Sequence, residues 1–324
     1  MGSKSSRSFF SKSRSSKTST KASLTRTDSE IMPDLDGIPR PPNNALEFKY
    51  IGGRRFYDEK VSSYVLPTDI DEVDRIQQQH FALKHICHGN HIAPIDKLIR
   101  PGSKILDVGC GPGQWSLEVA QEFPEAQVYG IDINSNFPSE IKPINCEFVL
   151  GDVENPLPWE DNYFDYVFMR YMFGAIKVKS WPPLLQEINR VLKPGGIIEN
   201  HEVDGIARNA GPKLLHIMHN VRNEMSERDL DISLATRLPD LIFESGFKNV
   251  HNTCVSVATG RWGNKIGEIW AANILELYQS MRPWLAAKAG YTDQEFDTVM
   301  DFICNKEIEK HQTYYNHHVV WAQK

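Results

Sequence analysis

The sequence has no long hydrophobic run and few cysteines. No apolar stretch approaches the roughly 18 residues that a membrane-spanning helix requires. The five cysteines are scattered and odd in number, which favours a reducing compartment over a disulfide framework. A chain of 324 residues, 40% hydrophobic and 24% charged, is long enough to bury a complete α/β core. We therefore expect a soluble, cytoplasmic protein with one main domain.

Acidic residues are missing from the first 27 positions, which carry seven lysines or arginines. The net charge of the whole chain is −6, so the remaining residues carry about −13. Proteins that bind nucleic acids broadly use basic patches to contact the phosphates. The acidic body therefore gives no strong signal for a nucleic-acid partner.

Residues 1–44 are predicted to form a separate, disordered tail that is basic and serine-rich and ends in a proline-rich linker. Its start fits the pattern for myristoylation of Gly2, and the basic residues supply the second, electrostatic signal that a single acyl chain needs. The same composition fits a plain tail without lipid, or a mitochondrial transit peptide. Membrane association through the N-terminus and a nuclear location thus stay open beside the cytoplasmic one.

A glycine is also missing where a dinucleotide-binding protein needs one. An apolar strand over residues 105–108 runs into Gly109, Gly111 and Gly113, and the apolar spacing that follows predicts a helix over residues 114–122. Strand, glycine turn and helix form the first half of a nucleotide-binding βαβ unit. The fingerprint G-x-G-x-x-G, counted from Gly109, requires a third glycine at a position that is glutamine here.

The acids around this turn indicate which nucleotide it binds. Asp107 lies two residues before the first glycine, where a carboxylate would repel a pyrophosphate but suits an ammonium group. S-adenosylmethionine (SAM) carries an ammonium and a sulfonium and no phosphate, so we predict SAM as the cofactor. A second strand over residues 127–132 ends in Asp132, placed to accept hydrogen bonds from a ribose diol. A third strand over residues 147–153 places Asp152 to accept from an adenine amino group.

The rest of the chain continues this alternation of strands and helices. The further strands are expected at residues 164–170, 197–202 after the turn at Pro194-Gly195, 250–258 and 314–322, and the further helices at 69–95, 212–227, 238–243, 266–285 and 294–308. The predicted fold is α/β, a doubly wound, seven-stranded, mostly parallel Rossmann-like sheet.

These blocks resemble the class I SAM-dependent methyltransferases, and more closely the fungal LaeA-like (TAM-domain) group. The resemblance lies in Tyr64–Asp69, Glu72–Ile76 followed by His80, Ala93–Ile95 and the tail motif Gly260-Arg261-Trp262 with Ile266-Gly267, and it covers roughly residues 45 to 324. It implies an antiparallel last strand, and a helix before the first strand that covers the cofactor. Gln77, Gln78 and His80 are the residues predicted to line that lid. The implied domains are an N-terminal helical lid segment, 45–100, and a methyltransferase domain, 101–324, with a helical insertion at 264–310.

Methyl transfer is an in-line displacement at a carbon that the sulfonium already activates. Positioning therefore supplies most of the acceleration, and a base is needed only where the acceptor atom must lose a proton early. Tyr171, His201 and Glu202, at the carboxyl ends of predicted strands, are the tentative catalytic residues, with a structural polar role as the alternative for His201 and Glu202. The residues predicted to contact SAM are Asp107, Gly109, Cys110, Gly111, Gly113, Asp132, Ile133, Asp152, Val153 and Arg170, the arginine as a partner for the SAM carboxylate.

Some properties stay open. No metal is expected, because His85, Cys87, His88 and His91 have no second Cys or His pair at zinc spacing elsewhere in the chain. The sequence suits a small-molecule or a protein acceptor equally. The alternative function is a regulatory protein that binds SAM, or only retains the fold, and acts through protein partners, as the resemblance to the LaeA-like group allows.

Overall fold

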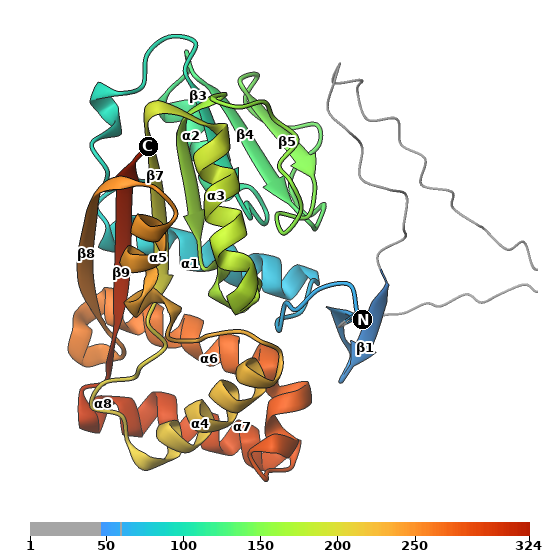
Figure 1. The fold of residues 1–324 in the computed structure, drawn as a ribbon. Coiled ribbons are helices and arrows are strands. Elements are labelled where there is room, and N and C mark those ends of the chain that lie inside the picture. Colours follow the sequence, from blue (N-terminus) through green and yellow to red (C-terminus); the bar gives the residue numbers. More distant parts are fainter. Residues whose placement is uncertain (1–46, 59) are drawn as a thin grey trace, which may run out of the picture. The chain divides into compact units, whose positions relative to one another are not determined.

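The computed structural model describes residues 47–58 and 60–324. Seven strands form one sheet in the order β5-β4-β3-β6-β7-β9-β8 (Figure 1). The strands are β3 (Lys104–Val108), β4 (Gln127–Asp132), β5 (Cys146–Leu150), β6 (Phe164–Arg170), β7 (Leu192–Val203), β8 (Lys248–Ala258) and β9 (Tyr314–Gln323). Strands β3 to β7 pair in parallel, and β9 pairs antiparallel with β7 and β8. The predicted doubly wound sheet and its antiparallel last strand are confirmed.

Helices flank this sheet and gather beyond the carboxyl ends of its parallel strands. They are α1 (Ile70–Ile86), α2 (Gln114–Glu122), α3 (Trp181–Val191), α4 (Pro212–Glu227), α5 (Leu238–Glu244), α6 (Asn264–Lys288), α7 (Asp293–Phe302) and α8 (Ile308–His311). The chain runs from β3 to β4 and β5 on one side and returns with β6 on the other side of β3. In open α/β sheets ligands bind at such a reversal, outside the carboxyl ends of the strands.

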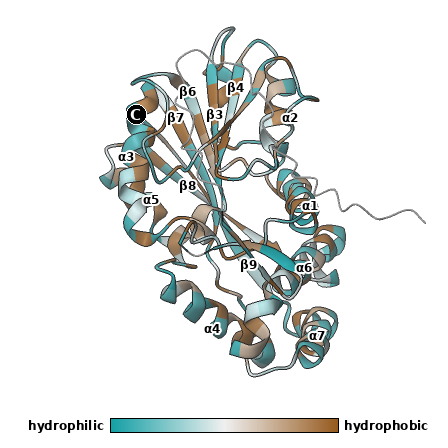
Figure 2. Cartoon of the chain, turned by 90° about the vertical axis from the view of Figure 1, so that its right-hand side faces the viewer, coloured by the Kyte–Doolittle hydropathy of each residue, from teal (hydrophilic) through white to brown (hydrophobic). Residues whose placement is uncertain are grey.

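The central strands are buried on both faces, which explains their apolar sequences. Val108 in β3 pairs with Ile131 in β4 and with Met169 in β6, and all three side chains are at most 2% exposed. Strands covered on both faces carry continuous apolar runs rather than alternation. Figure 2 shows hydrophobic residues along β3, β6 and β7.

A second apolar cluster lies beyond the carboxyl ends of the parallel strands, where α4, α6 and α7 gather (Figures 1 and 2). Leu214 and Ile217 of α4 and Leu285 of α6 are at most 1% exposed within it. Helices α6 to α8 correspond to the predicted insertion between the last two strands, with α7 shorter than expected because the chain continues as a π-helical turn over Ile303–Glu307. This cluster makes the wall that faces the sheet across the cavity described below.

The segment 45–100 is not only helical, as predicted, but starts with a hairpin of β1 (Phe48–Ile51) and β2 (Arg54–Tyr57). Its two-residue turn is Gly52-Gly53, and both glycines have positive φ, as a tight hairpin turn requires. Arg54 donates to the Asp69 carboxylate over 2.6 and 2.7 Å, and Asp69 caps the start of α1. The hairpin is thereby tied to the helix that was predicted as the lid.

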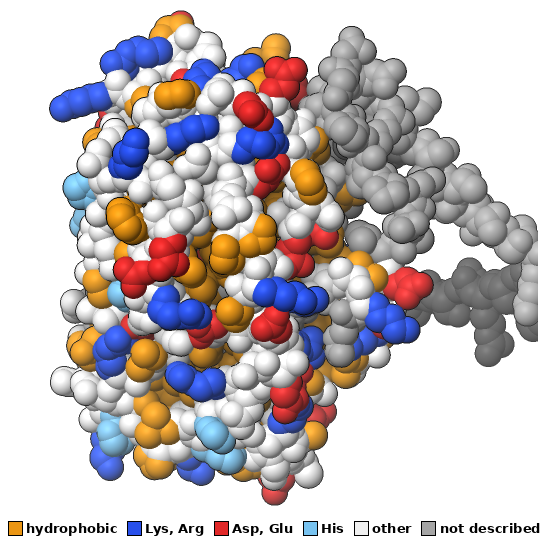
Figure 3. Space-filling view, in the orientation of Figure 1, with side chains coloured by type: hydrophobic (Ala, Val, Ile, Leu, Met, Phe, Trp, Pro, Cys, Tyr) orange, Lys and Arg blue, Asp and Glu red, His pale blue; other side chains and the backbone are white. Residues whose placement is uncertain are grey.

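The predicted tail, with Gly2 and its basic residues, lies outside the described residues. Strand β7 starts five residues earlier than predicted, because Leu192 already pairs with Phe164 before the irregularity at the Pro194-Gly195 turn. Within residues 47–58 and 60–324 no helix has the length and hydropathy to cross a membrane. On the face shown in Figure 3, acidic and basic side chains are interspersed.

Candidate functional site

A cavity of about 280 Å³ opens at the carboxyl ends of β3, β4 and β6 and extends to α4 and α6. One end is lined by Asp107, by the glycine turn and by the ends of β4 and β5. The other end is lined by apolar side chains of the helices. The cavity therefore lies at the chain reversal where the fold predicts a ligand.

The glycine turn between β3 and α2 forms one wall. Gly109, Gly111 and Gly113 have φ values of +70°, +55° and +78°, a region that L side chains rarely adopt. A Cβ on Gly113 would lie 2.5 Å from the Phe148 ring, whereas a Cβ on Gly111 would meet open space. Gly109, Cys110 and Gly111 line the cavity, and Gly113 instead starts α2 behind it. The turn thus exposes its backbone to the cavity.

Asp107, at the end of β3, is a buried carboxylate on the cavity wall. It is 3% exposed and accepts a hydrogen bond of 2.6 Å from Ser116 of α2. Burial raises the pKa of Asp107 to about 7, against the Ser116 hydrogen bond and the charge of Arg170, which lower it. Such a group gains strongly from a cationic partner.

Asp132, the last residue of β4, and Asp152, which follows β5, both line the cavity. The Asp132 carboxylate accepts from the amides of Gly111 and Asn134, both over 2.8 Å. The Asp152 carboxylate accepts from the Glu154 amide and from the Asn155 side chain, both over 3.0 Å. Both acids line the cavity, as do their neighbours Ile133 and Val153, so the structure brings together the residues predicted for the ribose and the adenine.

Arg170, at the end of β6, also lines the cavity. Its guanidinium lies 3.1 Å from Nδ1 of His80 on α1, and burial lowers its pKa. His80 in turn contacts Glu118 of α2 over 3.2 Å. Gln77, Gln78 and His80 are the residues predicted to line the lid, but Arg75, Ile76 and Gln79 are the α1 residues of this stretch that line the cavity, and His80 contacts Arg170 without lining the cavity. The prediction chose the wrong face of the helix for the two glutamines.

Tyr171 follows Arg170 and is a cavity residue with a strained backbone, since its φ is +56°. Its hydroxyl lies 2.7 Å from Nδ1 of His317 on β9. His317 is 5% exposed, and burial lowers its pKa to about 3, so it is a neutral imidazole at neutral pH. Trp270 of α6 packs its ring against His317, with the ring centroids 4.9 Å apart.

The two other catalytic candidates, His201 and Glu202, already have hydrogen-bond partners within the protein. His201 lies 2.6 Å from Glu199, a fully buried carboxylate that also accepts from the Tyr166 hydroxyl. Glu202 accepts from the amides of Met172 and Phe173, and burial raises its pKa to about 8. Neither His201 nor Glu202 is among the residues that line the cavity. These hydrogen bonds fit the structural role that the sequence left open for both residues, and a role as a base stays a prediction.

Three cavity-side residues were not found from the sequence. Tyr57, at the end of the hairpin, lines the cavity, and its buried hydroxyl has no hydrogen-bond partner among the described residues. The same holds for the Trp270 indole nitrogen and, behind the wall, for Nε2 of His317. Gly52-Gly53 between two four-residue strands was a usable signal for the hairpin that carries Tyr57. No local signal marks His317, whereas Trp270 belongs to the apolar stripe of the helix predicted over residues 266–285.

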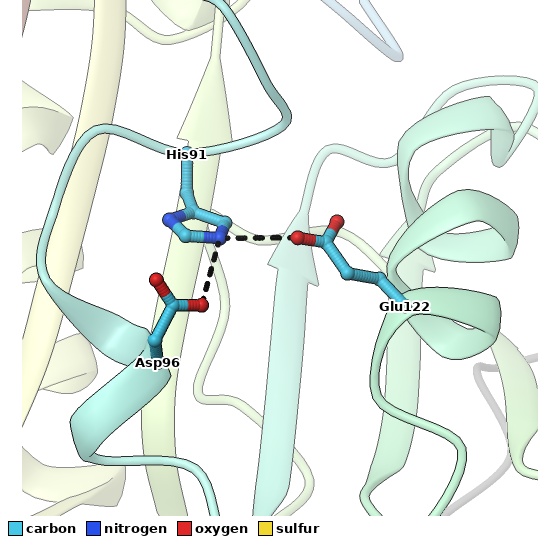
Figure 4. A group of neighbouring side chains, drawn as sticks. All are labelled: His91, Asp96 and Glu122. Atoms are coloured by element: carbon cyan, nitrogen blue, oxygen red, sulfur yellow. Dashed lines mark hydrogen bonds and ion pairs between the residues drawn. The ribbon is translucent and has the colours of Figure 1, made fainter.

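His91, Asp96 and Glu122 form a group with metal-ligand atoms close together (Figure 4). Nε2 of His91 lies 3.3 Å from Glu122 and 3.9 Å from Asp96, and Nδ1 lies 3.1 Å from the Ala93 carbonyl. The pKa of His91 is raised, because the acceptors around both ring nitrogens outweigh its burial. Both ring nitrogens of His91 therefore face oxygen acceptors, and a nitrogen that donates a hydrogen bond has no lone pair for a metal, so the group is best described as a hydrogen-bonded cluster.

Comparison with known proteins adds independent findings. Residues 105–196 match a family described as a methyltransferase domain. The chain is 29% identical to methyltransferase pytC of Aspergillus terreus over 270 residues, 78% of this chain and 80% of that protein. It is 30% identical to secondary metabolism regulator LAE1 of Cochliobolus heterostrophus over 238 residues, 71% of this chain and 76% of that protein.

A solved structure was also matched. Phosphoethanolamine N-methyltransferase 2 of Haemonchus contortus, in complex with S-adenosyl-L-methionine, aligns with a TM-score of 0.48 and 21% sequence identity. The alignment covers 83% of this chain and 61% of that chain, so this chain spans less than two thirds of that structure's length.

Proposed function

Because the chain belongs to the LaeA-like group of class I SAM-dependent methyltransferases and is a SAM-dependent methyltransferase, we propose that SAM binds against its glycine turn and that the methyl acceptor enters the same cavity. The observation that carries this proposal is the convergence of Asp107, Asp132, Asp152 and Arg170 on one end of the cavity. These four charged groups lie at the ends of β3, β4, β5 and β6.

Each group has a counterpart in SAM. The buried Asp107 carboxylate pairs with the ammonium, and the Arg170 guanidinium pairs with the carboxylate of the methionine part. Asp132 accepts from the ribose hydroxyls, and the unpartnered hydroxyl of Tyr57 supplies a further polar contact there. Asp152 accepts from the adenine amino group. The residues of this proposed cofactor site are Asp107, Gly109, Cys110, Gly111, Asp132, Ile133, Asp152, Val153 and Arg170, with Gly113 shaping the turn from behind.

The reaction needs little covalent chemistry from the protein. A lone pair of the acceptor atom forms a bond to the methyl carbon while the carbon–sulfur bond breaks and its electron pair stays on sulfur. S-adenosylhomocysteine is the product, and a proton carried by the acceptor atom leaves to water. The chain contributes by holding both reactants in line and by excluding water from the sulfonium. The wall formed by α1 and the hairpin supplies this exclusion in the proposed site.

Calorimetric titration of the purified chain with SAM, and separately with NAD, tests the proposal. We expect micromolar binding of SAM and no signal with NAD, because the cavity offers Asp107 where a pyrophosphate would lie. Absence of SAM binding on demonstrably folded protein, or binding of NAD, would contradict the proposed cofactor site.

Binding is also expected to depend on pH through Asp107. The raised pKa of about 7 means that its carboxylate is mostly protonated below pH 7 and cannot pair with an ammonium. The affinity for S-adenosylhomocysteine, whose amino group stays protonated in this range, should therefore fall about tenfold between pH 7.5 and pH 6. Titrations in buffers of different ionisation enthalpy should show proton release on binding near pH 6. Asp107→Asn should bind more weakly at pH 7.5 and lose the dependence, and an unchanged dependence in this variant would exclude Asp107 as its source.

A further inference from the structure

The half of the cavity away from the proposed SAM site is apolar. We call this half the acceptor chamber; it is lined by Met218, Val221 and Met225 of α4 and by Ile274, Leu277 and Met281 of α6. The three α4 side chains are at most 9% exposed. Methionines are flexible and polarisable, so such a wall adapts to apolar molecules of different shapes.

The only charged pair at the chamber's edge among the described lining residues, Glu72 and Arg75 of α1, is already satisfied. The Arg75 guanidinium donates to Glu72 over 2.6 to 3.0 Å and to Asn273 over 3.1 Å. The second oxygen of Glu72 also accepts from Ser280 over 3.0 Å. No lysine or histidine is among the described residues that line the cavity. A charged acceptor group would therefore lie in the chamber without a partner, which is costly.

Tyr171 is a polar side chain of the cavity wall next to the proposed SAM end. Tyr171 follows Arg170 directly, and its partner His317 packs against Trp270, which lines the cavity from α6. His317 has one ring nitrogen at the Tyr171 hydroxyl and the other without a partner. If the neutral imidazole carries its proton on Nε2, its Nδ1 accepts from the Tyr171 hydroxyl. The oxygen of Tyr171 then keeps its lone pairs for a donor in the cavity.

We propose that the acceptor chamber binds a neutral, largely apolar small molecule, and that the Tyr171 hydroxyl accepts a hydrogen bond from the hydroxyl group of this molecule that receives the methyl. Tyr171 touches the acceptor, and His317 is a positioning residue that fixes the direction of the tyrosine O–H bond. The hydrogen bond holds a lone pair of the acceptor oxygen toward the SAM end. The inference rests on the proposed SAM site, because only a methyl donor bound there gives the chamber an acceptor's role.

A series of naphthalenes tests the polarity of the chamber on the unaltered full chain loaded with S-adenosylhomocysteine. Equilibrium dialysis compares 2-naphthol with the anion 2-naphthoate and with the cation 2-naphthylmethylammonium. We expect 2-naphthol to bind at least about tenfold more tightly than either ion, because the ions lose hydration without gaining a partner. Equal or tighter binding of an ion would overturn the proposal, and so would transfer of tritiated methyl groups from SAM to a lysine-rich peptide.

Variants then locate the site. Val221→Trp fills the chamber and should weaken 2-naphthol binding at least about tenfold, whereas Leu215→Trp, on the same helix but 53% exposed, should leave it unchanged. Tyr171→Phe should weaken 2-naphthol about five- to tenfold and leave 2-methylnaphthalene, which has no donor, unchanged. His317→Phe should give the same split. A parallel loss of both naphthalenes in Tyr171→Phe would overturn the hydrogen-bonding role.

The affinity for S-adenosylhomocysteine is measured for every protein in the series. Retained affinity shows that a variant is folded, so that a naphthalene result can be interpreted. Failure of the unaltered chain to bind S-adenosylhomocysteine would overturn the proposed function itself. If the chain binds S-adenosylhomocysteine but binds one of the ions as tightly as 2-naphthol or more tightly, only this inference is overturned and the proposed function stands.

Discussion

Replacing Asp132 by alanine is expected to weaken SAM binding by about 10- to 100-fold. Two charge-assisted contacts to the ribose are lost, and hydrogen bonds to charged groups are worth about 1.5–3 kcal/mol. The variant also loses the acceptor of the Gly111 amide, which helps to fix the glycine turn. Isothermal titration with SAM at pH 7.5 measures the change in affinity. Asp132→Asn keeps the shape of the side chain but not its charge, so its affinity should lie between those of Asp132→Ala and the unaltered chain.

The same sheet offers a matched control at its opposite end. Asp165, near the start of β6, accepts from the Lys104 amide over 2.8 Å and from the Lys193 ammonium over 2.7 Å. Asp165→Asn should lower thermal stability slightly and leave SAM affinity unchanged, because the residue does not line the cavity. If folded Asp132→Ala bound SAM as tightly as the unaltered chain, the ribose would not lie at the end of β4.

The parallel part of the fold was predictable because its signals are local. Helix α2 and strands β4 and β6 have the bounds that the sequence predicts, since apolar runs there end at glycines or charged residues. Acids at the carboxyl ends of parallel strands must meet at one edge of the sheet, so Asp107 and Asp132 could be placed together without a structure. The hairpin before α1 was missed although its glycine pair was visible.

The choice between neighbouring polar residues on one strand could not be made from the sequence. Successive residues of a strand face opposite sides, so Glu199 and His201 share one face of β7 and Glu202 takes the other. Which side chain meets the cavity depends on what covers each face. The role of His317 could not be predicted for a related reason, because it contacts Tyr171 across a sequence separation of 146 residues.

The tail motif that contributed to the family resemblance is explained by packing. The Gly260 amide donates to the Gly267 carbonyl over 2.8 Å, and a Cβ on Gly267 would lie 2.2 Å from the Gly260 carbonyl oxygen. The motif thus brings the start of α6 close to the end of β8. A sequence motif alone does not separate this packing role from a role in binding.

Replacing Glu199 by leucine is expected to lower the free energy of unfolding by about 3–5 kcal/mol, the cost of removing one partner from a buried polar network. Its carboxylate is 0% exposed and accepts from the amides of Ile92 and Ala93, from Tyr166 and from His201, over 2.6 to 2.9 Å. Urea unfolding at pH 7 measures the loss. Glu268→Leu, which removes an exposed ion pair with Lys265 of 3.4 Å, is the control and should cost less than about 1 kcal/mol.

The pH dependence of this network gives a second measure of the same residue. Burial opposes ionisation of Glu199, but the hydrogen bond and charge of His201 and the two backbone amides hold its pKa below the usual range. A lowered folded-state pKa adds stability above the unfolded pKa of about 4.3, and this stability is lost as the pH falls. Glu199→Leu should therefore lose less stability than the unaltered chain as the pH falls from about 5 to about 3, below the unfolded pKa. If Glu199→Leu instead kept its stability and lost only its rate of methyl transfer, the stabilising role would be wrong. Glu199 would then orient His201 as a base in the reaction.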